Sequence, residues 1–102
     1  MLQKFVIVRS NEAGIFYGLL SELKENKETG YYSVMLNNAR RIWSWQGAAT
    51  ISELAVRGTS TPEECLVPAA VESIMIARVL EIIPLTQQAK DNLYSIPEWS
   101  GW

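Results

Sequence analysis

The sequence predicts an α+β fold that is mostly β, in which an antiparallel rolled sheet or small barrel carries two short helices. Three observations favour this fold class. Apolar, β-branched runs follow one another along the chain, short polar turns separate them, and helix-capping signals occur at only two places. A chain of 102 residues has room for one hydrophobic core, so residues 1–102 are expected to form a single domain.

Runs of apolar residues predict five or six strands. Residues 11–14 have turn chemistry between the first two runs, and the polar residues 24–30 predict the tip of a second hairpin. Asn37 and Asn38 are candidates for a further turn. Pro84 is expected to end the longest strand. The strands expected from these signals span residues 5–8, 15–23, 31–36, 40–45 and 73–83.

Two short helices are expected after the first four strands and at the C-terminal end. Thr50 and Glu53 match a capping box, in which hydroxyl and carboxylate accept hydrogen bonds from free amides at a helix start, and Gly58 is a candidate C-terminal cap. Thr86 is expected to cap the second helix, residues 87–95. The tail that follows contains Trp99 and Trp102. A solvated aromatic tail is unfavourable, so at least Trp99 is expected to dock.

The chemistry available to the chain is restricted. It contains no histidine, the commonest general base near neutral pH and the commonest metal ligand. The single cysteine, Cys65, is expected to be a small packed residue rather than a nucleophile, and no glycine-rich phosphate loop occurs. We therefore expect a protein that is not an enzyme and that uses no metal and no cofactor.

The overall charge limits the partners. The formal net charge of -2 and the sequence pI of about 5.1 give no general attraction to polyanions, so nucleic acid is not an expected partner. No apolar stretch has the length and composition of a membrane span, so no membrane association is expected either.

Residues 37–47 have an unusual composition, with two of the five arginines, two of the four tryptophans and no acidic residue. If residues 41–45 form a strand, Arg41, Trp43 and Trp45 share one face, and Arg40 shares the other with Ile42. Guanidinium groups suit phosphate or carboxylate, and indoles suit base stacking. The candidate ligand-binding residues are Asn37, Asn38, Arg40, Arg41, Trp43 and Trp45.

Three interpretations of this segment remain open. Two tryptophans on one face of a strand are also typical of core packing, and the combination of arginine and tryptophan is typical of protein interfaces as well as of sites for small anions. The small residues that follow, Gly47 to Ala49, lead into the first predicted helix. The backbone amides at this helix start are a further candidate anion-binding site, although Thr50 caps some of them.

The same segment carries a family resemblance. The stretch Asn-Ala-Arg-Arg-Ile-Trp-x-Trp-x-Gly-Ala, residues 38–48, is followed by Ser52 to Ala55, by Gly58 and Pro62, and later by Glu81 to Pro84. These features resemble a family of small proteins from tailed phages and prophages that is catalogued as a domain of unknown function. The resemblance implies an origin in a phage genome and expression in the cytoplasm of the bacterial host. It implies no activity.

These observations lead to two functional hypotheses. In the first, a non-catalytic phage protein forms a homo-oligomer and sequesters a small phosphate-bearing, nucleotide-like ligand, possible roles including the capture of a host defence signal. Arg40 and Arg41 would bind phosphate, Trp43 or Trp45 would stack on the base, and Asn37 or Asn38 would contact its polar edge. In the second, the protein is structural or binds a partner, and the arginine–tryptophan segment is an oligomer interface.

Overall fold

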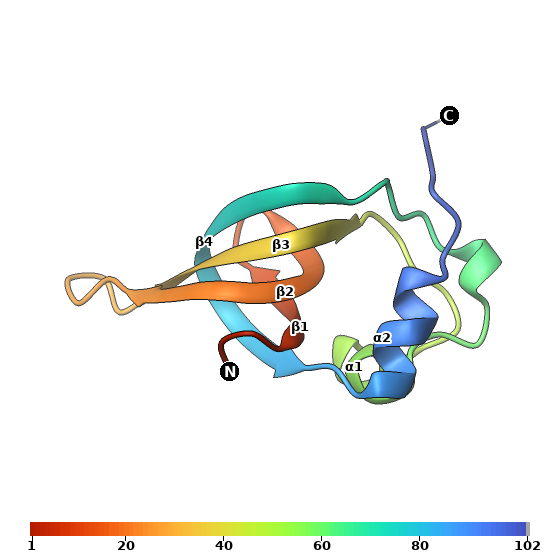
Figure 1. The fold of residues 1–102 in the computed structure, drawn as a ribbon, viewed down its shortest axis with the longest axis horizontal. Coiled ribbons are helices and arrows are strands. Elements are labelled where there is room, and N and C mark those ends of the chain that lie inside the picture. The colour runs from red at the N-terminus through yellow and green to blue at the C-terminus, as the bar shows by residue number, and fades with distance from the viewer. Residues whose placement is uncertain (102) are drawn as a thin grey trace.

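A computed structural model describes residues 1–101; Trp102 of the aromatic tail lies outside the described residues. The predicted fold class is confirmed: four antiparallel strands form a closed ring and two short helices pack beside it (Figure 1). In chain order the elements are β1 (Phe5–Ser10), β2 (Gly14–Glu25), β3 (Tyr32–Ile42), α1 (Ile51–Arg57), a 3-10 turn (Pro62–Glu64), β4 (Val71–Pro84) and α2 (Gln87–Tyr94).

Each strand of the ring pairs with two others. β1 pairs with β2 and β4, and β3 also pairs with β2 and β4, in each case antiparallel. The long β4 closes the ring because residues 71–79 pair with β3 and residues 79–84 pair with β1. As predicted, Pro84 ends this strand.

The predicted turn at Asn37 and Asn38 is wrong. β3 runs through both residues without interruption, so the two strands expected on either side of them are one strand. The local feature is a β-bulge instead: the register between β2 and β3 shifts here, and Asn38 has φ 50°. Asparagine tolerates this left-handed conformation better than most residues, and this preference also underlies its frequency in turns.

The bulge exchanges the two faces of β3. Before it, Val34 and Leu36 point into the ring; after it, Ala39 points into the ring. Arg40 and Ile42 therefore face the helices outside the ring. In a regular strand the period of two would have placed Arg40 on the same side as Val34 and Leu36. The bulge thus decides which arginine faces the helices.

Two hydrophobic clusters stabilise the fold. The first fills the ring, and the second lies between the outer surface of the ring and the two helices. Burial of apolar surface in these two layers supplies the main driving force for folding. Buried residues of the first cluster are Val6, Val8, Phe16, Leu20, Val34, Leu36, Ala39, Ile76 and Val79. Those of the second include Ile7, Tyr17, Ile42, Leu54, Val67, Leu93 and Ile96.

The predicted capping residues are confirmed at both helices. The Thr50 hydroxyl accepts the amide of Glu53, and the Glu53 carboxylate accepts the amide of Ala49 at 2.8 Å. The amide of Gly58 closes the helix on Leu54 at 3.0 Å. Because the protein's own carboxylate occupies the Ala49 amide, this helix start no longer offers that amide to an external anion.

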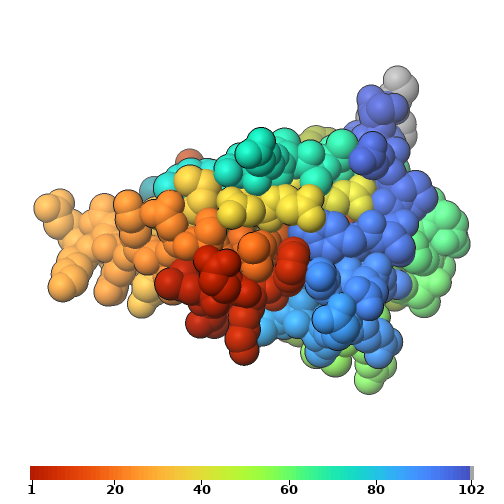
Figure 2. Space-filling model, in the orientation of Figure 1, coloured from red at the N-terminus to blue at the C-terminus, as the bar shows by residue number. Residues whose placement is uncertain are grey.

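The hairpin between β2 and β3 projects from the ring. Its strands continue to Glu25 and Tyr32, and the predicted polar tip lies beyond them (Figures 1 and 2). Asn26 stabilises the tip, since its side-chain oxygen accepts the amides of Glu28 and Thr29. None of the helices formed by residues 1–101 is long and apolar enough to cross a membrane.

Candidate binding site at the end of strand β3

Arg40 lies inside the protein, 4% exposed, with its guanidinium between β3 and the chain segments packed outside the ring. Four of its five N–H groups donate to backbone carbonyls. The acceptors are Pro68 at 2.9 Å, Val67 and Ile96 at 2.8 Å each, and Leu93 at 3.4 Å. This arrangement leaves Arg40 unavailable to a phosphate, contrary to the role expected from the sequence, and makes it a structural cross-link.

The charge of Arg40 is stabilised by dipoles rather than by a carboxylate. None of the four ion pairs among residues 1–101 includes it. Two of its acceptors lie near the C-terminal end of α2, where the helix dipole favours a cation: Leu93 in the last turn and Ile96 just beyond the helix. A buried guanidinium with its donors satisfied in this way avoids most of the cost of an unpaired buried charge.

Two tyrosines complete the surroundings of Arg40. Burial raises the pKa of Tyr17 above its usual range, and the Arg40 guanidinium opposes this shift. Burial likewise raises the pKa of Tyr94 to about 12, again against the influence of Arg40. Both hydroxyls are therefore protonated at neutral pH and act as donors: Tyr17 to the Leu93 carbonyl at 2.5 Å, and Tyr94 to the Asn38 carbonyl at 2.6 Å.

Arg41, the next residue, lies at the end of the ring and is exposed. Its guanidinium carbon is 4.4 Å from the centre of the Phe16 ring, the cross-strand neighbour of Arg41. One N–H group donates to the Ala13 carbonyl at 2.8 Å. No carboxylate among residues 1–101 pairs with Arg41. Arg41 is thus the member of the arginine pair that can meet a ligand.

Trp43 is the most exposed large apolar residue described, with 64% of its surface accessible. Its ring stacks on that of Trp99, with 6.2 Å between centroids and 26° between planes. The predicted docking of Trp99 is confirmed: its amide also donates to the Val67 carbonyl at 3.0 Å. The two indoles form an aromatic surface at the C-terminal end of β3.

Trp45 does not share this surface. The chain bends after β3, and Trp45 packs against the cluster between the ring and the helices, which also contains Ile42. Its indole N–H donates to the Ala48 carbonyl at 3.0 Å. The prediction that Trp45 lies on one face with Arg41 and Trp43 is therefore wrong, because the alternation of faces holds only as far as the strand does.

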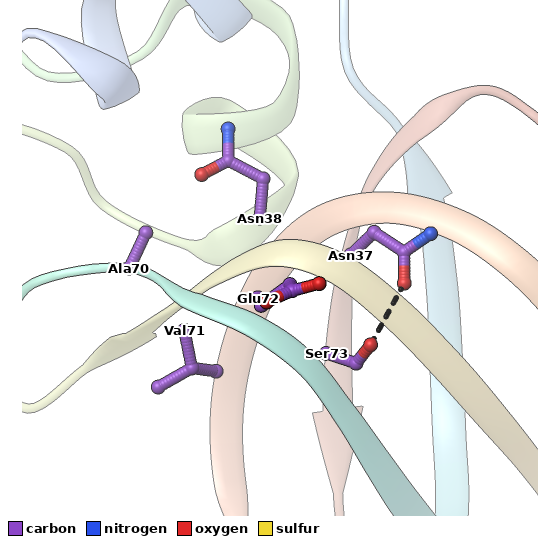
Figure 3. A pocket seen from close by; sticks show the side chains of 6 residues that line it. All are labelled: Asn37, Asn38, Ala70, Val71, Glu72 and Ser73. Carbon is purple, nitrogen blue, oxygen red and sulfur yellow. Dashed lines mark hydrogen bonds between the residues drawn. The ribbon is translucent and has the colours of Figure 1, made fainter.

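Asn37 and Asn38 line an open recess of about 560 Å³, together with residues 70–73 at the start of β4 (Figure 3). Ser73 donates from its hydroxyl to the side-chain oxygen of Asn37 at 3.3 Å, while the Asn38 side chain points away from this pair (Figure 3). The recess also contains Glu72, whose negative charge opposes the binding of a phosphate. Neither arginine lines it.

A second, smaller recess contains Arg41 and had no counterpart in the sequence prediction. It has a volume of about 130 Å³ and adjoins the first, since Val71 lines both. Phe16 could have been matched to Arg41 from the hairpin register alone. The other wall includes Pro68, Ala69 and Val71, which come to β3 only through closure of the ring, and nothing local in the sequence indicates that contact.

Among residues 1–101, no group of three or more histidine, cysteine, aspartate and glutamate residues could hold a metal ion. Cys65 is buried, with its sulfur 3.6 Å from the carbonyl oxygens of Gln46 and Thr61. It is a buried member of the second cluster, so its predicted role as a packed residue is confirmed.

Comparison with known proteins identifies the family. A family model described as a domain of unknown function (DUF6948) matches residues 3–93, a span that contains all four strands, α1 and all but the last residue of α2. No curated protein and no solved structure matches the chain. The resemblance to a domain of unknown function is thereby confirmed, and the chain belongs to the DUF6948 family.

Proposed function

We propose that this protein is a non-catalytic binding protein that forms a homo-oligomer, with the surface of Trp43 and Trp99 as the contact between copies. The observation that carries this proposal is the 64% exposure of Trp43, which persists although its ring already stacks on Trp99. Tryptophan is enriched among the residues that supply most of the binding energy at protein interfaces. Neither of the two recesses beside β3 includes Trp43, so a flat contact suits it better than an enclosed ligand.

A second copy of the chain is the partner that this surface fits. Stacked indoles are self-complementary, and a two-fold axis brings the same patch of both copies together. The formal net charge of -2 gives little repulsion between copies. The four strands already pair in a ring, so the contact relies on side chains rather than on extension of the sheet.

The replacement Trp43→Ala is expected to shift the protein toward the monomer, while leaving its thermal unfolding midpoint nearly unchanged. The indole contributes a large exposed area to the contact between copies and little to either hydrophobic cluster. Sedimentation velocity at micromolar concentration measures the oligomeric state of both proteins.

Met75→Ser is the control. Met75 is another exposed large apolar residue, with 50% of its surface accessible, but it lies on β4 away from the tryptophans. This variant is expected to associate like the original protein. A monomeric original protein, or equal loss of association in both variants, would contradict self-association through Trp43.

A second candidate function is the sequestration of a small phosphate-bearing, nucleotide-like ligand. The observation that favours it is that Arg41 is exposed and has no carboxylate partner among residues 1–101, and that the exposed Trp43 follows two residues later. Arg41 would bind phosphate and Trp43 would stack on the base. In this candidate the protein comes from a phage and acts in the cytoplasm of its bacterial host, where it captures a nucleotide signal.

Denaturation of protein purified from bacteria is expected to release the nucleotide if this second candidate holds. Mass spectrometry of the supernatant detects it, and Arg41→Gln protein serves as the control because it should release less. Equal amounts of nucleotide from both proteins, or none from either, would count against the candidate.

A further inference from the structure

The small recess at the end of the ring has the composition of a binding site for an organic anion. Its buried part is formed by Phe16 and Ala39, which are 1% and 2% exposed. Its outer part includes the exposed residues Arg41 and Val71. Pro68 and Ile74 contribute to the remaining wall. Among the described residues that line the recess, Arg41 is the one cation, and it lies beside an apolar hollow that reaches the cluster inside the ring.

The guanidinium of Arg41 has donors to spare. One of its five N–H groups donates to the Ala13 carbonyl, and its carbon lies 4.4 Å from the centre of the Phe16 ring, a cation–π contact. The ion pairs among residues 1–101 do not involve Arg41. Two parallel N–H donors of an arginine can bind both oxygens of a carboxylate at once.

The position of Arg41 follows from the bulge at Asn38. This bulge turns Ala39 toward the inside of the ring, leaves the exposed Arg41 on the same side of β3, and sends Arg40 to the helices. The phenyl group of Phe16 belongs to the first cluster, inside the ring of strands. Its contact with Arg41 holds the guanidinium at the end of that ring. The same bulge therefore places both the cation, Arg41, and a residue of the apolar hollow, Ala39.

We propose that this recess binds a small organic carboxylate with a compact apolar tail. The carboxylate pairs with Arg41, and the tail lies against Phe16 and Ala39. The recess holds about 130 Å³, and a dry apolar cavity of about 150 Å³ in another protein accommodates benzene, so the tail is of benzene size. A whole nucleotide is too large to enter. This proposal is independent of self-association through Trp43.

Titration with benzoate, followed by two-dimensional NMR of the methyl groups, tests the proposal. Benzoate is expected to shift the methyl resonances of Ala39 and Ile74, which line the recess. Benzyl alcohol lacks the charge and acetate lacks the tail, so each is expected to bind at least about tenfold more weakly than benzoate. Binding should also weaken as ionic strength rises.

Two variants localise the effect. Arg41→Gln is expected to weaken benzoate binding by about tenfold or more, with the methyl spectrum otherwise retained. Arg57→Gln is the control, because Arg57 is an arginine with a 73% exposed side chain on α1. It is expected to bind benzoate like the original protein.

Three results would overturn the assignment. Benzoate could bind without shifting the methyl resonances of Ala39 and Ile74, or the Arg41 and Arg57 variants could lose affinity for benzoate equally. Benzyl alcohol could also bind as tightly as benzoate. Adenosine monophosphate that shifts the two methyl groups as strongly as benzoate does would overturn the compact tail. Light scattering under the same conditions measures the oligomeric state, so a failure of benzoate binding is distinguished from a failure of self-association through Trp43.

Discussion

Replacing Arg40 with alanine is expected to lower the free energy of unfolding by about 3–5 kcal/mol. The guanidinium donates four hydrogen bonds to carbonyls of two separate segments. Alanine would leave these buried carbonyls without the guanidinium donors. Val67 and Leu93 each keep another donor, the amide of Trp99 and the hydroxyl of Tyr17. The loss therefore falls mainly on Pro68 and Ile96 and on the volume vacated by the side chain.

Arg41→Ala is the matched control, since it removes the same side chain one position along β3. Arg41 is exposed and makes one hydrogen bond and one ring contact, so the expected loss is about 1 kcal/mol or less. Urea denaturation followed by circular dichroism measures both variants. Equal stabilities of the two variants would show that Arg40 does not cross-link β3 to α2.

The local signals in the sequence were sufficient for the two helices, and they placed most strand ends within about two residues of those observed. Thr50 and Thr86 act as caps because a hydroxyl beside free amides is a short-range interaction, and Pro84 ends β4 because it has no amide to donate. These features depend on neighbours within a few residues. They need no knowledge of the tertiary structure.

The different roles of Arg40 and Arg41 in the candidate site could not be predicted in the same way. Arg40 and Arg41 are the same residue type in adjacent positions, and their roles depend on a bulge whose sequence signal, Asn37 and Asn38, equally indicates a turn. The carbonyls that receive Arg40 come from residues 27 to 56 positions away along the chain. Only the closed ring and the docked α2 bring them together.

The replacement Gly18→Val should show how far the bulge controls this arrangement. Gly18 is buried opposite the bulge, and a Cβ atom there would lie 2.9 Å from the Asn37 carbonyl oxygen and 3.1 Å from the Ala39 Cα. Both contacts are with backbone, so the strands must move apart. The expected loss of unfolding free energy is about 3 kcal/mol for valine and about 1–2 kcal/mol for alanine.

Asn38→Gly provides the control for the same bulge. Glycine adopts the φ of 50° without strain, and the Asn38 carbonyl that accepts the Tyr94 hydroxyl is a backbone group, so stability should change by about 1 kcal/mol or less. Amide hydrogen exchange in β2 and β3 reports the separation of the strands directly. If Gly18→Val keeps both its stability and its exchange protection, the strands tolerate a side chain opposite the bulge. In that case the bulge does not by itself hold Arg40 toward the helices and Arg41 over the end of the ring.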